Sequence, residues 1–229
     1  YFYLKGDELG GDGGGGRDTV DFSLATQAIS GPISMPNIEI IRGSGFNDVI
    51  MGGGSSKIEL FGGLGSDTLV GGQGADKLYG NDDNDADTLT GGGGADVFYV
   101  GDGDIVTDAT TSDRLALSDG KFISGEATRP EGSDEPYEGD NGYTFTLSGS
   151  NLTIDAGGAR ITIQNFSDGD LGITLREEDD DDDDSGVEDT PNPVGGGGQL
   201  GSPLVFDLYG DGLDLVHLVN SGAYFDINP

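Results

Sequence analysis

Residues 62–79 read GGLGSDTLVGGQGADKLY and contain one nine-residue pattern twice, as GGLGSDTLV and as GGQGADKLY. In both copies glycine occupies positions 1, 2 and 4, aspartate occupies position 6, and leucine occupies position 8. A flexible Gly/Asp-rich linker is an alternative interpretation, but a linker has no reason to keep leucine at a fixed position. The repetition therefore predicts a regular structure that is built from nine-residue units.

The same pattern continues on both sides of these two copies. GGGGADVFY (residues 91–99) is a third good copy, and GNDDNDADTLT (80–90) is a copy with two extra residues. GGSSKIELF (53–61) keeps the glycines but has Ile58 in place of the aspartate. The weaker copies are GSGFNDVIM (43–51), GGGGRDTVD (13–21) and the fragment GDELG (6–10).

Elementary geometry suggests what each unit does. Three residues such as Thr68-Leu69-Val70 should form a short strand with the middle side chain on the inner face. The six residues before the strand reverse the chain, and glycine permits the positive φ angles that such turns need. Each turn then gathers carbonyl oxygens around one carboxylate, and calcium takes about six to eight hard oxygen ligands of this kind. The expected inward stack comprises Leu69, Leu78, Leu89 and Phe98, with Ile50 and Leu60 below them.

The composition supports a fold that carries cations. The chain has 229 residues, with 10 basic and 43 acidic side chains and a formal net charge of −33. Such a chain repels itself unless cations neutralise it, and it should not bind nucleic acid, because phosphates require Lys and Arg. The sequence has no cysteine, which excludes disulfides and thiolate sites. No apolar run is long enough to span a membrane.

The aligned copies match G-G-x-G-x-D-x-U-x, where U is a large apolar residue, so residues 1–175 resemble the RTX (repeats-in-toxin) calcium-binding family. The resemblance implies an all-β parallel β-roll with calcium-binding Gly/Asp turns, in which successive turns alternate sides. It also implies several Ca²⁺ ions between turns, with Ile58 interrupting one row, and folding that is coupled to calcium binding. The metal-site candidates are Asp18, Asp48, Gly62, Gly65, Asp67, Gly71, Gly74, Asp76, Asp82, Asp87, Gly91, Asp96, Asp102, Asp104, Asp207 and Asp211.

We expect four regions along the chain: a β-roll over residues 1–106 with an insertion at about 22–42, an antiparallel β cap over 107–175, an acidic and Gly-rich linker over 176–199, and a truncated further module over 200–229. The alternation of Ile38, Ile40 and Arg42 predicts a strand that enters the roll. Residues 124–142 are turn formers and acids and predict an exposed loop. Alternating apolar residues predict antiparallel cap strands; they are Tyr143, Phe145, Leu147, Leu152, Ile154, Ile161 and Ile163.

The C-terminal residues have separate signals. Glu177–Asp184 are eight consecutive acids, which indicate a solvated segment or loose calcium capture. DLYGDGLD (207–214) is similar to the opening of the RTX self-processing module, which cuts an Asp-Pro bond when calcium binds. Ser202-Pro203 stands in place of that pair, so the cleaving aspartate is missing. The lone histidine, His217, lies in an apolar run, and HExxH and G-x-S-x-G are both absent, so no enzyme is expected.

These features predict a secreted or cell-surface structural module that folds on binding Ca²⁺ and rigidifies or assembles an adhesin, surface layer or fibre. Further copies of the chain are the expected partners, through exposed strand edges at residues 1–3 and 223–225. The alternative is a calcium-dependent secretion and folding tail of a larger toxin or hydrolase whose active domain lies outside this chain.

Overall fold

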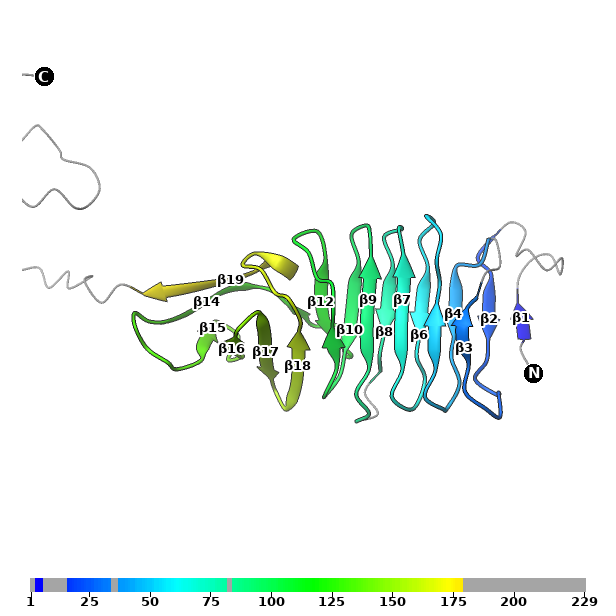
Figure 1. Cartoon of the computed structure of the whole chain (residues 1–229), viewed down its shortest axis with the longest axis horizontal. Coiled ribbons are helices and arrows are strands. Elements are labelled where there is room, and N and C mark those ends of the chain that lie inside the picture. The colour runs from blue at the N-terminus through cyan, green and yellow to red at the C-terminus, as the bar shows by residue number, and fades with distance from the viewer. Residues whose placement is uncertain (1–2, 6–15, 34–36, 82–83, 179–229) are drawn as a thin grey trace, which may run out of the picture. The chain divides into compact units, whose positions relative to one another are not determined.

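The structure, a computed structural model, describes residues 3–5, 16–33, 37–81 and 84–178 (Figure 1). All of these residues lie in one structural unit, Tyr1–Ser185, whereas the second unit, Gly186–Pro229, lies outside the described residues. The described residues form strands and one short 3₁₀ helix, η1 (Asp170–Gly172), which confirms the all-β prediction. None of them forms a helix with the length and hydrophobicity that crossing a membrane requires.

The described strands belong to two sheets, one of eight and one of eleven strands. Sheet A contains, in spatial order, β1 (Tyr3–Lys5), β2 (Thr19–Asp21), β4 (Ile40–Arg42), β6 (Glu59–Phe61), β8 (Lys77–Tyr79), β10 (Val97–Val100), β12 (Arg114–Leu117) and β13 (Phe122–Ile123). Sheet B contains, in spatial order, β19 (Ile173–Glu178), β14 (Gly125–Pro130), β15 (Tyr137–Gly139), β16 (Thr144–Ser148), β17 (Asn151–Ala156), β18 (Ala159–Ile163), β11 (Ile105–Val106), β9 (Thr88–Gly92), β7 (Thr68–Gly72), β5 (Val49–Met51) and β3 (Ser30–Pro32).

From β2 to β12 the chain alternates between the two sheets, so two nine-residue units make one turn of a parallel β-roll. Leu60 in sheet A therefore lies opposite Leu78, and Leu69 in sheet B lies opposite Leu89. Neighbouring strands in each sheet run parallel because every turn repeats the path of the one before it. The roll predicted from the repeat is confirmed.

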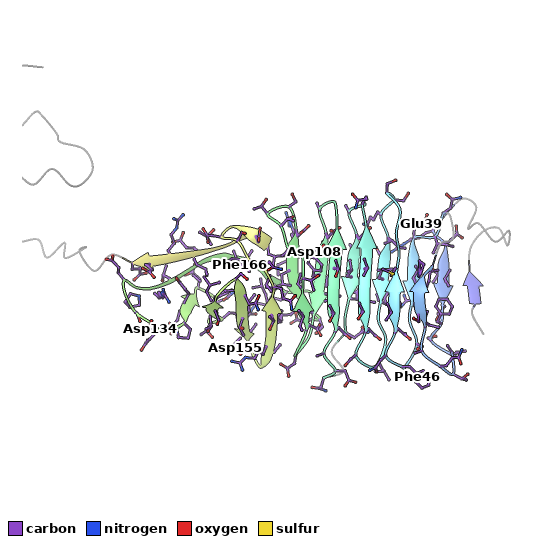
Figure 2. All side chains as sticks on the ribbon, in the orientation of Figure 1. Glu39, Phe46, Asp108, Asp134, Asp155 and Phe166 are labelled. Carbon is purple, nitrogen blue, oxygen red and sulfur yellow. The ribbon has the colours of Figure 1, made fainter. Side chains whose placement is uncertain are left out.

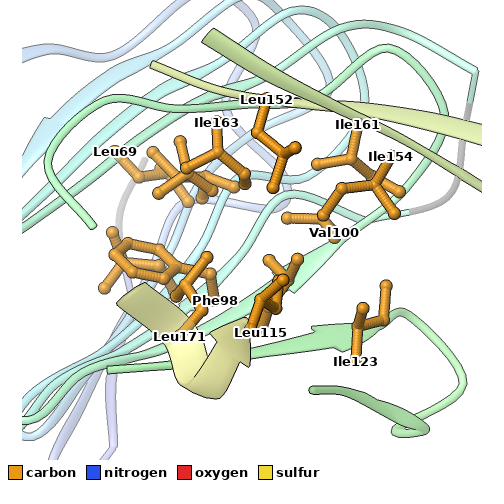
Figure 3. Packing of buried hydrophobic residues seen from close by; sticks show 14 of the residues in the cluster. Leu69, Phe98, Val100, Leu115, Ile123, Leu152, Ile154, Ile161, Ile163 and Leu171 are labelled. Carbon is orange, nitrogen blue, oxygen red and sulfur yellow. The ribbon is translucent and has the colours of Figure 1, made fainter. Parts of the chain in front are cut away.

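The core of the roll consists of the position 8 side chains, which are fully buried (Figure 3). They form two facing ladders, rather than the single stack expected from the sequence, because successive units lie on opposite sheets. The sheet A ladder comprises Val20, Ile41, Leu60, Leu78, Phe98 and Leu115. The sheet B ladder comprises Ile50, Leu69, Leu89 and Val106, and Ile163 of the adjoining strand β18 continues it.

The segment expected to be an insertion contributes strands to both sheets. β3 pairs with β5 in sheet B, and β4 lies between β2 and β6 in sheet A. Within β4, Ile41 is fully buried and Ile40 faces outward, so the expected alternation through Ile40 is shifted by one residue. Parallel pairing also continues to β12, past residue 106, because Arg114–Leu117 pair with β10.

Strands β14 to β18 form consecutive antiparallel pairs at the C-terminal end of the roll, and β18 joins them to the roll by pairing with β11 in parallel. The predicted alternation holds, except that Leu147 is exposed. The expectation of an exposed loop over 124–142 holds only in part: most of these residues are exposed, but β14 and β15 pair there and bury Ala127 and Tyr137. β14 also pairs with β19, which extends to Glu178.

Candidate metal centre

The aspartates at position 6 directly precede the strands, and the alternation of the chain sorts them into two rows. Row A is defined as the residues that precede the parallel strands of sheet A: Asp18, Glu39, Ile58, Asp76, Asp96 and Asp113. Row B is defined as the carboxylates that precede those of sheet B: Asp48, Asp67, Asp87 and Asp104. All eight aspartates are at most 4 % exposed. Figure 2 shows the two edges of the roll, with Glu39 of row A on one and Phe46, from a row B loop, on the other.

Row B is an uninterrupted ladder of hydrogen bonds between turns. In each case Oδ1 accepts from the backbone N–H of the corresponding residue one turn earlier. The N···O distances are 2.7 Å from Ile29 to Asp48, 2.7 Å from Asp48 to Asp67, 2.7 Å from Asp67 to Asp87, and 2.9 Å from Asp87 to Asp104. Hydrogen bonds to an ionised acceptor are stronger than neutral ones, so each carboxylate links two successive turns.

Row A has the same ladder but loses one carboxylate. The backbone N–H groups of Ile58, Asp76 and Asp96 each donate over 2.8 Å to the next carboxylate along the row. Glu39 takes the place of an aspartate and accepts from the Asp18 N–H at 2.8 Å. The side chain of Ile58 is buried and has no oxygen, so the row of carboxylates is interrupted there, as the sequence indicated.

The second carboxylate oxygen, Oδ2, points back over the glycine that opens the same loop. An ideal Cβ placed on Gly71 would lie 2.5 Å from Asp76 Oδ2 and 2.5 Å from the carbonyl oxygen of Gly91 in the next turn. Gly62 and Gly91 have the same relation to the aspartates of their own loops. Glycine is therefore required at position 1 because the space that a side chain would fill is bounded by oxygen atoms.

In row B the oxygen atoms of two turns converge on one glycine. A Cβ on Gly80 would lie 2.7 Å from Asp87 Oδ2 and 2.6 Å from Asp104 Oδ2. The position 2 glycines bring the backbones together in a similar way: a Cβ on Gly92, which has φ of +93°, would collide with the carbonyl oxygen of Gly72. Two carboxylates in such proximity repel each other unless a cation lies between them.

Burial raises the pKa values of two aspartates of row A, Asp76 and Asp96. Burial, with a smaller contribution from the neighbouring carboxylate of Asp96, raises the pKa of Asp76 to about 6, although the Ile58 N–H favours the ionised form. Burial also raises the pKa of Asp96, with further contributions from Asp113 and Asp108. Asp76 Oδ2 is buried and accepts no hydrogen bond of normal geometry. The nearby Gly72 N–H nevertheless favours the ionised form of the Asp76 carboxyl group. Without a cation, the fold therefore penalises the charged forms of Asp76 and Asp96.

The other predicted site residues fall into three groups. Gly65 and Gly74 lie against the backbone of the neighbouring turn. A Cβ on Gly65 would meet Phe46 and Asn47, and a Cβ on Gly74 would meet Ser56 and Lys57. Asp102 is exposed, and its Oδ1 accepts a hydrogen bond from the Arg160 N–H at 2.7 Å, so it holds strand β18 and lies outside both rows. Asp82, Asp207 and Asp211 lie outside the described residues.

Three acidic residues near the rows were missed by the sequence reasoning. Asp113 ends row A and accepts from the Asp96 N–H and from Thr110. Its Asp-x-Leu triplet, nine residues after Asp104, is a signal that could have revealed it. Glu39 was missed because it is not an aspartate. Asp108, labelled in Figure 2, accepts from the Gly91 and Gly92 N–H groups at 2.9 and 2.7 Å, and no repeat position marks it.

The donor set fits calcium. Within the described part of the chain, no three His, Cys, Asp or Glu side chains form a cluster, so each loop offers its carboxylate together with backbone oxygens of neighbouring turns. Such hard, flexible oxygen donors suit Ca²⁺ better than Mg²⁺, which needs near-ideal octahedral geometry, or Zn²⁺, which prefers nitrogen and sulfur. A bound Ca²⁺ ion would compensate the negative charge of these carboxylates.

Comparisons with known proteins agree with this geometry. Residues 36–56, 61–86 and 86–104 match the family model of the RTX calcium-binding nonapeptide repeat. These residues are therefore RTX calcium-binding repeats, and the roll that they form is an RTX calcium-binding β-roll, which is non-catalytic in itself. A search of curated proteins finds no match to the chain.

Proposed function

We propose that this chain is a secreted or cell-surface structural module that folds when it binds Ca²⁺, and that it rigidifies or assembles an extracellular adhesin, surface layer or fibre. The observation that carries this proposal is the pair of buried carboxylate rows, which cost free energy when charged and uncompensated. Because the carboxylates converge only in the folded chain, calcium binding and folding are coupled. Extracellular calcium then acts as the folding switch.

In this proposal the position 6 aspartates of both rows bind the ions, together with backbone oxygens of the loops. Asp67 and Asp87 occupy the middle of row B, where carboxylates lie on both sides. Asp76 and Asp96 have the same role in the unbroken part of row A. The glycines at position 1 contribute by leaving room for the oxygens.

Sedimentation velocity across a calcium titration tests the proposal, because it reports shape and mass together. We expect an expanded monomer in a chelator to become compact as calcium rises, whereas magnesium at the same concentration should have little effect. A further rise in mass would support assembly. A chain with the same sedimentation coefficient with and without calcium would contradict the proposal.

The second candidate function is a calcium-dependent secretion and folding tail of a larger toxin or hydrolase. The observation in its favour is that residues 36–56, 61–86 and 86–104 match RTX calcium-binding repeats, which are non-catalytic in themselves. A catalytic domain in the same reading frame would favour this alternative, and further repeats would favour the adhesin or fibre.

Self-processing is a separate proposal for residues 200–229, which lie outside the described residues. Cleavage would require a carboxylate where Ser202 stands, so we expect the chain to remain intact. Denaturing gel electrophoresis after incubation with calcium would reveal fragments if another residue performed the cleavage.

A further inference from the structure

The outward faces of the two sheets differ in charge. In sheet A, five of the six parallel strands from β2 to β12 contain an ionisable acid or base: Asp21, Arg42, Glu59, Lys77 and Arg114. In sheet B, the strands β3, β5, β7, β9 and β11 contain none. We call the outward side of these five strands and of Thr162 in β18 the neutral face.

The neutral face presents hydroxyl and apolar groups in register. Because Ile50, Leu69 and Leu89 point inward, the residues on either side of them point outward. The outward residues of the three central strands are Val49, Met51, Thr68, Val70, Thr88 and Thr90. Val49 is 37 % and Met51 38 % exposed, and both are among the exposed large hydrophobic residues of the described chain.

This lack of charge is unusual in a chain with a formal net charge of −33. At physiological ionic strength the Debye length is about 8 Å, so the charges close to a contact decide whether like-charged molecules repel each other. Two copies of this chain that meet through their loop edges bring acidic side chains together. Two copies that meet through the neutral face keep the charged strand residues of sheet A out of the contact. The charged residues next to the face in β17 and β18, Asp155 and Arg160, form an ion pair with each other at 3.3 Å.

We propose that the neutral face is a self-association surface, on which a second copy of this chain packs its own neutral face. This inference rests on the proposed function, because only the calcium-loaded roll displays the face, and it assigns assembly to a sheet face instead of to strand edges. A two-fold contact is self-complementary, so one patch suffices for both partners. Threonine, valine and methionine side chains suit packing between sheets about 10 Å apart.

The size of the face sets the strength of the contact. Six strands about 4.8 Å apart, each about 10–15 Å long, cover roughly 300–400 Å². Stable complexes bury about 800 Å² on each partner, so the contact belongs to the weak and transient class. It therefore becomes effective where modules are held at high local concentration, as along a fibre or on a surface.

A charge substitution on each sheet tests the proposal. Thr88→Lys places a lysine on the neutral face, and Val97→Lys places one at the same repeat position in sheet A. Lys77 occupies that repeat position naturally, so the fold accommodates the side chain. In saturating calcium, the sedimentation-average mass of the parent chain and of Val97→Lys should rise with protein concentration, whereas Thr88→Lys should stay monomeric.

Crosslinking provides a second readout, since the chain has no cysteine of its own. Thr88→Cys should give a covalent dimer with a short bis-maleimide in calcium and none in a chelator, and Val97→Cys should give little in either. The proposal is overturned if the parent stays monomeric up to millimolar concentration, or if Thr88→Lys associates as well as Val97→Lys. Circular dichroism of each variant separates the outcomes, because failure of calcium-induced folding contradicts the proposed function, and normal folding without association contradicts only this inference.

Discussion

Row A and row B share one backbone geometry but differ in their carboxylates. Row B has an aspartate before each of the strands β5, β7, β9 and β11, whereas row A has Ile58 in the middle. At Ile58 the backbone still donates its N–H to Asp76, and β6 keeps its register with β4 and β8. The sheets and the core therefore maintain the path of the chain, and the carboxylate rows add the ion chemistry.

The interruption also has a local packing consequence. A Cβ on Gly52 would lie 3.1 Å from two carbon atoms of Ile58, so the isoleucine side chain covers the glycine that an aspartate oxygen covers in the other loops. An apolar group thus replaces an oxygen without altering the turn. We expect this position to stabilise the roll independently of calcium, whereas row B depends on calcium along its whole length.

Removing one aspartate from each row should have the largest effect on the calcium concentration at which the chain folds. Asp67 has carboxylates on both sides, whereas Asp76 has Ile58 on one side. Asp67→Ala should therefore raise the calcium concentration at the folding midpoint by about a hundredfold, or about 2.7 kcal/mol, and Asp76→Ala by about tenfold. Calcium titrations followed by far-UV circular dichroism measure both midpoints. Equal shifts for the two variants would mean that the rows do not differ.

A methyl group in the oxygen-bounded space should have the next largest effect. Gly71→Ala places a Cβ 2.5 Å from oxygens of Asp76 and Gly91, and should cost about 2 kcal/mol, as overpacked sites do. Gly45→Ala is the matched control, because no heavy atom lies within 4 Å of its Cβ. Thermal unfolding in saturating calcium compares the two, and a Gly71→Ala variant as stable as Gly45→Ala would exclude a tightly packed loop.

Restoring the missing carboxylate in row A should have a smaller effect on the calcium concentration at the folding midpoint. Ile58→Asp gives row A an unbroken run of carboxylates, so it should bind at least one additional calcium ion and lower the folding midpoint by about threefold, or about 0.7 kcal/mol. Ile58→Asn, which has the same shape without the charge, should add no ion. Equilibrium dialysis with radioactive calcium counts the ions, and an unchanged count for Ile58→Asp would show that an aspartate alone does not complete the site.

We expect the smallest effect from pH. The pKa of Asp76 is about 6 in the metal-free fold and lower in the unfolded chain, so the folded state binds protons more tightly. Charged Asp76 then destabilises the metal-free fold at pH 7, and this destabilisation is lost as the pH falls through 6. In a chelator the small folded fraction, measured by far-UV circular dichroism, should therefore rise between pH 7 and pH 5. Asp76→Asn should reduce this rise. In calcium the sign reverses, because protons compete with the ion for the carboxylates.

Much of the fold follows from the repeat alone. Leucine or phenylalanine at position 8 fixes which side chain points inward, glycine at position 1 leaves room for oxygens, and aspartate at position 6 identifies the donor. Local composition was misleading in residues 124–142, where turn formers and acids indicated a loop. There, pairing with β16 and β19 outweighs local propensity, and it buries Ala127 and Tyr137.

The period, the inward positions and the type of ion could be predicted from the sequence, because they depend on residue types at fixed spacing. Which aspartates are neighbours depends on the three-dimensional path of the chain, since two units per turn place Asp67 beside Asp48 and Asp87 and away from Asp76. This path also places Glu39 and Asp113 in row A and assigns Asp102 to the junction with β18. These assignments depend on contacts between residues that are 17 to 58 positions apart, and such contacts exist only after the sheets have paired.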